Sequence, residues 1–319
     1  MPRRVLVLLA AACLCARAVD AQKLSIQGDR FAIDARPRFL TFITYFGAMG
    51  APNAAADVHL IKRLGFDGVR IWPNLDTGPQ LMNADGSLRP TGLAALRAIL
   101  DRARRERLVV DVTFTSEHIA GMTPATARVG IAAATEALRA YDNLLFDIQN
   151  ERNVPDRRFM SEADVARIRA AIKAIDPDRI AFASNAPVDD ARYAADMTAR
   201  LGLDVTAYHE PRLADWYQLG FIQRIVRVLR SNGRPAYLQE PMATRDSRSA
   251  QPSNTRADYF LQARANAQAA GAAAWCFHTR VGVDFRSGPA LLEDRLRTYS
   301  EPEWAFVSSL KRRVASAMR

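Results

Sequence analysis

The strongest constraint on the fold is an alternation that repeats along most of the chain. Short runs rich in β-branched and aromatic residues are each followed by a longer stretch with the spacing of an amphipathic helix. The runs predicted as strands are Phe39–Tyr45, Gly68–Trp72, Leu108–Phe114, Leu144–Gln149, Arg179–Ser184, Leu203–Tyr208, Ala236–Gln239 and Ala272–Phe277. Strands that alternate with helices form a parallel α/β sheet, and eight of them close it into a (β/α)8 TIM barrel.

The segments between these runs complete the pattern. The predicted helices are Asp57–Leu64, Thr91–Arg107, Thr126–Tyr141, Ser161–Ile175, Asp190–Leu201, Leu219–Leu229, Thr255–Ala269 and Glu303–Ala317. Before the first strand, the alternation from Leu24 to Ile33 around Gly28-Asp29 predicts a short N-terminal hairpin. An open doubly wound sheet would carry a glycine-rich phosphate turn after its first strand, and residues 47–50 match that turn poorly. We expect one catalytic barrel domain over residues 22–319.

The first 21 residues have the anatomy of a signal peptide. Arg3 and Arg4 form a basic start, residues 5–15 are a short apolar run, and small residues around Ala18 and Ala21 offer cleavage sites. The run is too short to span a bilayer, and no later segment approaches a transmembrane length. We therefore expect a secreted or periplasmic protein, exported by either the general or the twin-arginine route. Cleavage after Ala21 leaves Cys276 as the one cysteine, which excludes an intramolecular disulfide.

The formal net charge of +10 raises the question of nucleic-acid binding. The leader holds three arginines and one aspartate, so its removal lowers the charge from +10 by 2 to +8. The remaining arginines are spread over most of the predicted helices, without a dense basic run interleaved with aromatic residues. We expect no nucleic-acid partner, no membrane span and a monomer; attraction to acidic polysaccharide or to a cell surface stays open.

Polar and aromatic residues recur where the predicted strands end. In a barrel of this kind, side chains at the C-terminal ends of the strands converge on one mouth. These residues are Arg70 and Trp72 on the second strand, Asn150 and Glu151 at the end of the fourth, Tyr208 and His209 at the end of the sixth, Glu240 at the end of the seventh, and Trp275 on the eighth with His278 beyond it. Two carboxylates, an arginine, a histidine and several rings would thus face one pocket.

Two carboxyl groups in one pocket suit the cleavage of an acetal. That reaction needs one protonated carboxyl to release the leaving oxygen and one ionised carboxylate to attack the anomeric carbon, about 5 Å apart when the configuration is retained. Glu151 and Glu240 stand on opposite sides of the predicted barrel mouth. We expect Arg70 to keep Glu240 ionised and the repulsion between the two glutamates to raise the pKa of Glu151.

With these positions in place, the chain resembles the (β/α)8 glycoside hydrolases that carry catalytic glutamates on strands four and seven, most of all the cellulase-like family five. The matching segments are 65–72, 146–151, 235–240 and 274–275. The resemblance implies a retaining O-glycosyl hydrolase of β-linked oligo- or polysaccharides, without cofactor or metal. It implies that Glu151 is the acid/base and Glu240 the nucleophile.

The same comparison implies roles around the two glutamates. Asn150 would bind the sugar 2-hydroxyl, Tyr208 or His209 would orient a carboxylate, and Trp72 and Trp275 would offer flat faces to a pyranose. The chain departs from family five on its third strand, where 111–114 lacks a terminal histidine, and on its sixth, which has Tyr-His in place of His-x-Tyr. The sugar, the linkage and the choice between endo and exo cleavage stay open.

Two other functions are compatible with these residues. The first is a metal-dependent barrel such as a sugar isomerase, in which a divalent ion would be bound by Glu151, His209 and Glu240, with Asp111 as a further ligand. This function would leave Asn150 and the tryptophans without a role. In a non-catalytic carbohydrate-binding barrel, the aromatic residues would bind sugar and the glutamates would form structural ion pairs. Dependence on a metal, or inertness of the wild type, would distinguish these from a hydrolase.

Overall fold

The computed structural model describes residues 22–75, 78–241, 256–278 and 304–310. The predicted signal peptide and its cleavage site lie outside the described residues, as does most of the predicted last helix. Within the described part of the chain, no helix combines the length and the apolar character needed to cross a membrane.

Eight parallel strands form the barrel that the sequence predicts. They are β4 (Leu40–Thr44), β5 (Gly68–Ile71), β6 (Val109–Thr113), β7 (Leu144–Asp147), β8 (Ile180–Phe182), β9 (Thr206–Tyr208), β10 (Ala236–Leu238) and β11 (Ala274–Phe277). Their order in space follows the chain, and the last strand, β11, pairs with the first, β4. A parallel bridge between Asn185 and Tyr208 joins the chain beyond β8 to β9 and closes the ring.

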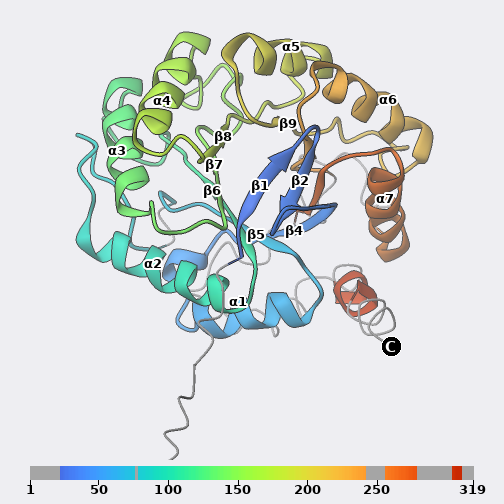
Figure 1. The fold of residues 1–319 in the computed structure, drawn as a ribbon, viewed down its shortest axis with the longest axis horizontal. Helices are drawn as coiled ribbons and strands as arrows, with labels where there is room; N and C mark the ends of the chain where they lie inside the picture. The colour runs from blue at the N-terminus through green and yellow to red at the C-terminus, as the bar shows by residue number, and fades with distance from the viewer. Residues whose placement is uncertain (1–21, 76–77, 242–255, 279–303, 311–319) are drawn as a thin grey trace, which may run out of the picture.

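A ring of helices surrounds the strands (Figure 1). They are α1 (Ala54–Arg63), α2 (Pro90–Arg105), α3 (Pro124–Ala137), α4 (Glu162–Ile175), α5 (Ala191–Leu201), α6 (Leu219–Leu229) and α7 (Ala257–Ala269), with residues 304–310 helical after β11. The side chains of Ser161 and Asp190 cap α4 and α5 by accepting hydrogen bonds from backbone N–H groups three residues on. These caps explain why both helices begin within one residue of the predicted start.

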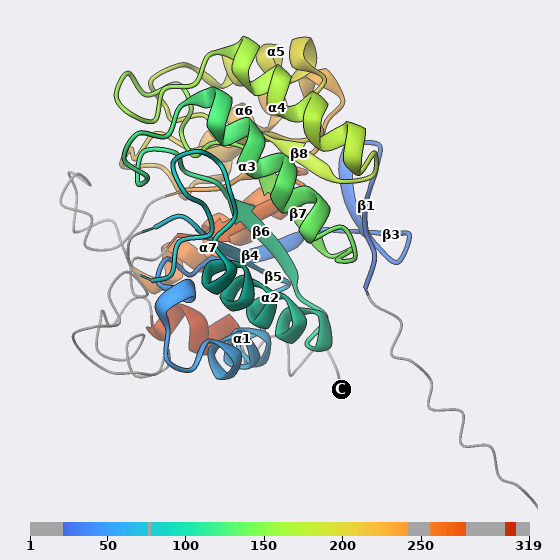
Figure 2. The ribbon, with the colours of Figure 1, turned by 90° about the vertical axis from the view of Figure 1, so that its left-hand side faces the viewer.

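A small antiparallel sheet covers one end of the barrel. It comprises the predicted hairpin, β1 (Leu24–Gln27) and β2 (Arg30–Ile33), and a third strand, β3 (Arg36–Arg38), which the sequence does not predict because it is short, exposed and contains proline. The Leu24 backbone N–H donates to the carbonyl of Asp142, just before β7, and the Arg30 side chain donates to that of Ala272, just before β11. The sheet therefore closes the N-terminal end of the barrel (Figures 1 and 2).

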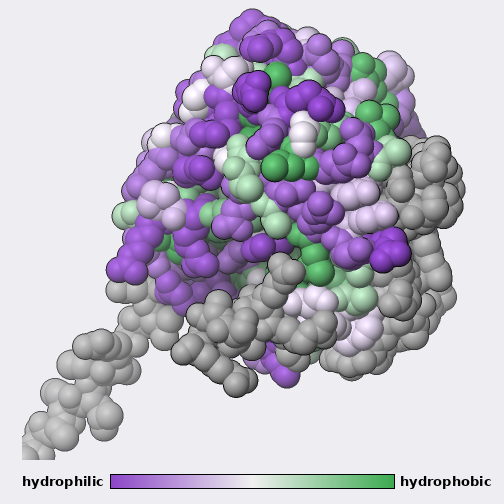
Figure 3. Space-filling view, turned by 90° about the vertical axis from the view of Figure 1, so that its right-hand side faces the viewer, coloured by the Kyte–Doolittle hydropathy of each residue, from purple (hydrophilic) through white to green (hydrophobic). Residues whose placement is uncertain are grey.

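The surface agrees with an ordinary globular protein. On the side of the molecule where α6 and α7 lie, hydrophobic residues are interspersed among hydrophilic ones (Figure 3). Exposed large hydrophobic residues such as Leu213 and Leu219 are common singly on soluble proteins. This face therefore gives no argument for a membrane or a large apolar partner.

Candidate active site

The site is organised around Arg70, which lies on β5 and is fully buried inside the barrel. Its guanidinium donates hydrogen bonds to Glu240 Oε1 (2.6 Å), to Asn150 Oδ1 (2.7 Å) and to Thr113 Oγ1 (2.9 Å). Each of these acceptors comes from a different strand or strand end. The sequence prediction that Arg70 and Glu240 meet is confirmed by this geometry.

A layer of buried polar side chains lies against Arg70. Asp111 Oδ2 is 3.6 Å and Asp147 Oδ2 is 3.4 Å from the guanidinium, and the amide of Gln239 donates to both carboxylates at 2.9 Å and 3.2 Å. Burial raises the pKa of Asp111 and raises that of Asp147 to about 7, although Arg70 opposes the rise. The sequence named Asp111 only as a possible metal ligand and did not predict its contact with Arg70, although single polar residues that interrupt apolar strands are a signal for such a layer.

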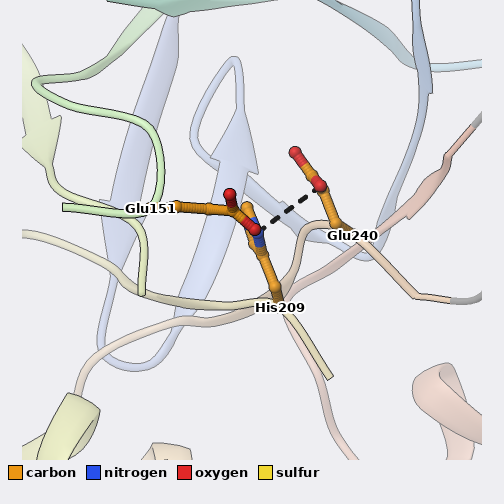
Figure 4. Close-up of side chains that lie close together, drawn as sticks. All are labelled: Glu151, His209 and Glu240. Carbon is orange, nitrogen blue, oxygen red and sulfur yellow. Dashed lines mark hydrogen bonds and ion pairs between the residues drawn. The ribbon is translucent and has the colours of Figure 1, made fainter. Parts of the chain in front are cut away.

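His209 lies between the two glutamates (Figure 4). Its Nδ1 is 3.1 Å from Glu151 Oε1 and 3.5 Å from Glu240 Oε2, and its Nε2 is 3.2 Å from Gln239 Oε1. The amide nitrogen of Gln239 already donates to two buried carboxylates, so its oxygen must face His209, and the Nε2 of His209 carries a proton. A second proton must then lie between Nδ1 and Glu151, because neither a bare ring nitrogen nor a carboxylate can donate.

Glu151 occupies an unusual backbone position just after β7. Its φ of +48° lies in the left-handed region, which costs a non-glycine residue free energy and is commonest at functional sites. The Ser184 hydroxyl accepts a hydrogen bond from its N–H at 3.0 Å, and Arg158 forms an ion pair with its carboxylate. The loop that follows β7 therefore holds this side chain in place.

The pKa of Glu151 differs from the expectation. Burial raises it, but the hydrogen bond and charge of His209, together with Arg158, outweigh burial and the repulsion of Glu240. Its pKa is therefore lowered, and the prediction of a raised value is wrong. Arg158 lies seven residues farther along the chain in a loop, where no periodicity indicates a contact.

Glu240 is held in the ionised form. Burial opposes ionisation, but His209, His278 and Arg70 together lower the pKa of Glu240 below its usual range. His278 follows β11, and its Nε2 lies 3.7 Å from Glu240 Oε2. The predicted ionised state of Glu240 is therefore consistent with its surroundings, whereas the raised pKa predicted for Glu151 is not.

The two predicted sugar-binding tryptophans do not present a free face. Trp72 is 2% exposed, stacked on Phe46 (ring centroids 4.1 Å apart) with the Arg70 guanidinium 4.4 Å from its ring centroid. Trp275 is fully buried and packs against Phe306 of the last described helix. Side chains on a strand alternate, so Trp275 faces the helices. The stacking prediction is wrong for both residues.

The remaining predicted residues have distinct places. Asn150 contacts Arg70 through its Oδ1, which leaves its Nδ2 hydrogens to donate to a ligand. The Tyr208 hydroxyl donates to the carbonyl of Asp189 at 3.1 Å, away from the glutamates. Of the two candidates for orienting a carboxylate, the structure favours His209.

We expect Arg70→Met to destabilise the protein by about 3–5 kcal/mol at pH 7, because it leaves buried carboxylates without their cation. The loss should be smaller at pH 5, where protonation of the raised-pKa carboxyls, such as Asp147, removes part of the unpaired charge. Urea unfolding of both proteins at the two pH values measures this. Arg256→Met, which breaks an exposed pair with Asp258, is the control and should leave the urea midpoint close to that of the wild type at both pH values. Equal losses in the two variants would contradict the central role of Arg70.

Comparison with known proteins gives matches by structure only: no protein-family model and no curated protein matches the chain. A GH5_18 protein from Streptomyces cattleya, solved with GlcNAc, is 18% identical, with a TM-score of 0.60 over 86% of this chain and 80% of that one. The endo-1,4-β-mannanase from Rhizomucor miehei is 13% identical, with a TM-score of 0.63 over 92% and 99%. The exo-β-1,4-mannosidase Op5Man5 from Opitutaceae bacterium strain TAV5 is 16% identical, with a TM-score of 0.65 over 92% and 62%. The chain thus shares the (β/α)8 fold of solved family-five glycoside hydrolases, the family that its sequence resembles.

Proposed function

We propose that this protein is a secreted retaining glycoside hydrolase acting on β-linked glycosides or polysaccharides. One observation carries the proposal: a carboxylate oxygen of Glu151 and one of Glu240 lie within 4.8 Å of each other, at the ends of the fourth and seventh barrel strands. Retaining enzymes hold their carboxyl groups about 5–5.5 Å apart, and inverting ones about 6.5–9.5 Å. Secretion rests on the signal peptide predicted over residues 1–21.

In the first step, Glu240 is the nucleophile. Its carboxylate, held by Arg70, attacks the anomeric carbon, and the bond from that carbon to the leaving oxygen breaks as the glycosyl ester forms. Glu151 gives its proton to the leaving oxygen. The proton shared between Glu151 and Nδ1 of His209 supplies this acid, because the Nε2 of His209 is fixed by Gln239.

In the second step, the roles reverse. A water molecule attacks the anomeric carbon, Glu151 accepts its proton, and Glu240 leaves as a carboxylate, so that the product keeps the starting configuration. The Nδ2 of Asn150 is free to donate to a hydroxyl of the bound sugar, because its Oδ1 is taken by Arg70. β-1,4-Mannans and mannosides are the first substrates to test, since two of the structural neighbours are a mannanase and a mannosidase.

A metal-dependent reaction is the second candidate, because Glu151, His209 and Glu240 could also hold an ion. Asp111, the fourth ligand considered, contacts Arg70 and Gln239 beneath that group. The guanidinium of Arg70 already neutralises Glu240, so a divalent ion would meet a buried positive charge there. This electrostatic environment favours the hydrolase.

We expect Glu240→Ala to lose activity on dinitrophenyl β-glycosides by on the order of 10⁴-fold or more, because the nucleophile is gone. Azide should restore turnover and give the α-glycosyl azide by direct displacement. Glu151→Ala with azide should give the β-glycosyl azide, because azide there attacks the glycosyl enzyme. NMR of the products distinguishes the two anomers.

The same assays separate the alternatives. Activity that disappears with a chelator and returns with a divalent ion would support the metal-dependent enzyme. A wild type as inert as Glu240→Ala across glucans, mannans and aryl glycosides, but still binding sugar, would support a carbohydrate-binding barrel. Either result would contradict the hydrolase.

We expect Arg158→Gln to move the basic limb of the kcat/KM pH profile upward by roughly one pH unit. Protonated Glu151 is the acid, so activity is lost as pH rises through its pKa, and Arg158 lowers that pKa. Removing the cation raises the pKa and extends activity to higher pH. Arg157→Gln, at the exposed neighbouring position, is the matched control and should leave the limb in place. A limb that moves equally in both variants would contradict the pairing of Arg158 with Glu151.

A further inference from the structure

The eighth strand brings His278 to the site in the place where the sequence suggested a tryptophan. Residues 276 and 278 lie on the opposite face of this strand from Trp275, which packs against the helices. His278 is 4% exposed, and its Nε2 lies 3.7 Å from Glu240 Oε2. No step proposed above uses this imidazole.

The ring nitrogens of His278 have different surroundings. Burial and nearby arginines lower its pKa to about 4 despite Glu240, so the ring is neutral near pH 7 and carries one proton. The carboxylate of Glu240 can only accept a hydrogen bond, which favours that proton on Nε2 and makes Nδ1 an acceptor. Within the described part of the chain, Nδ1 is buried and has no hydrogen-bond partner. A buried acceptor without a donor is costly, and a ligand hydroxyl would satisfy it.

Phe46 lies beside the imidazole of His278. It follows β4, its ring is edge-on to His278 at 5.8 Å between centroids, and it stacks on Trp72 at 4.1 Å. Among these three rings, Phe46 is the one that is partly exposed. The accessible apolar surface of this group of rings is therefore that of Phe46, with Trp72 stacked against it.

We propose that His278 and Phe46 form the wall that recognises the sugar ring attacked by Glu240. The Nδ1 of His278 accepts a hydrogen bond from one free sugar hydroxyl, and the face of Phe46 packs against the C–H face of the ring. The pair selects a glycone that has a hydroxyl at that one position and rejects a glycone in which it is missing. This inference rests on the proposed function and names the residues that set its sugar specificity.

A matched pair of variants tests the hydrogen bond. In His278→Asn the side-chain oxygen can replace Nδ1 as the acceptor, whereas in His278→Gln the amide group lies nearer the place of Nε2. The substrates are the best aryl β-glycoside of the wild type and its analogues with single hydroxyls replaced by fluorine, which cannot donate. We expect one hydroxyl position of the sugar to stand out. Fluorine at that position should lower kcat/KM about tenfold more in the wild type and in His278→Asn than in His278→Gln.

A second pair tests the apolar surface. We expect Phe46→Ala to raise KM roughly tenfold with a smaller change in kcat. Trp275→Phe is the control, because among the residues that the structure describes the buried indole Nε1 has no hydrogen-bond partner to lose. It should keep KM within about twofold of the wild-type value.

The outcomes separate this inference from the proposed function. Each fluorine effect is a ratio of two substrates on one variant, so a lower yield of folded protein cancels. If each fluorine substitution lowers kcat/KM by the same factor in the wild type and in His278→Gln, the proposed role of His278 is wrong. If azide still rescues Glu240→Ala in that case, the proposed hydrolase function is unaffected. An unchanged KM in Phe46→Ala would overturn the role of Phe46. Inertness of the wild type towards all aryl glycosides would overturn both proposals.

Discussion

The rest of the site depends on a guanidinium buried inside the barrel. A cation without access to water is tolerated only when carboxylates and hydrogen-bond acceptors surround it, and Arg70 has Asp111, Asp147 and Glu240 as charged partners. These partners come from β6, β7 and the end of β10. The interactions that stabilise the interior of the barrel are thus the same ones that orient a carboxylate at its mouth.

Proton placement follows from this arrangement. Gln239 donates both amide hydrogens to the buried aspartates, so its oxygen fixes the protonation of His209, and His209 in turn shares a proton with Glu151. A chain of donors and acceptors therefore leads from the floor of the barrel to the acid/base. The two glutamates differ in their closest partners: the buried guanidinium of Arg70 binds Glu240, whereas Glu151 is hydrogen-bonded to His209 and paired with Arg158 on the loop after β7.

The sequence predicted the barrel well because its strands are short apolar runs and its helices have clear caps, as Ser161 and Asp190 show. The sequence also predicted that Glu151 and Glu240 lie at the ends of the fourth and seventh strands. The end of an apolar run can be located in the sequence without knowing in which direction each side chain points. The prediction failed for Trp275, whose direction depends on the phase of the strand rather than on its location. The contact of Arg158 and the resulting pKa of Glu151 depend on a loop conformation that has no periodic signal.

The left-handed backbone of Glu151 has a consequence for how this chain can change by mutation. Such a conformation costs a non-glycine residue on the order of 1–3 kcal/mol, and glycine adopts it freely. Replacement of this glutamate by glycine would relieve that strain while removing the carboxyl group. Backbone strain by itself favours glycine here, against the contacts of the carboxylate with Arg158 and His209. If the glutamate is kept in related sequences, the reason is therefore its function in the site, because the backbone strain at this position favours its replacement.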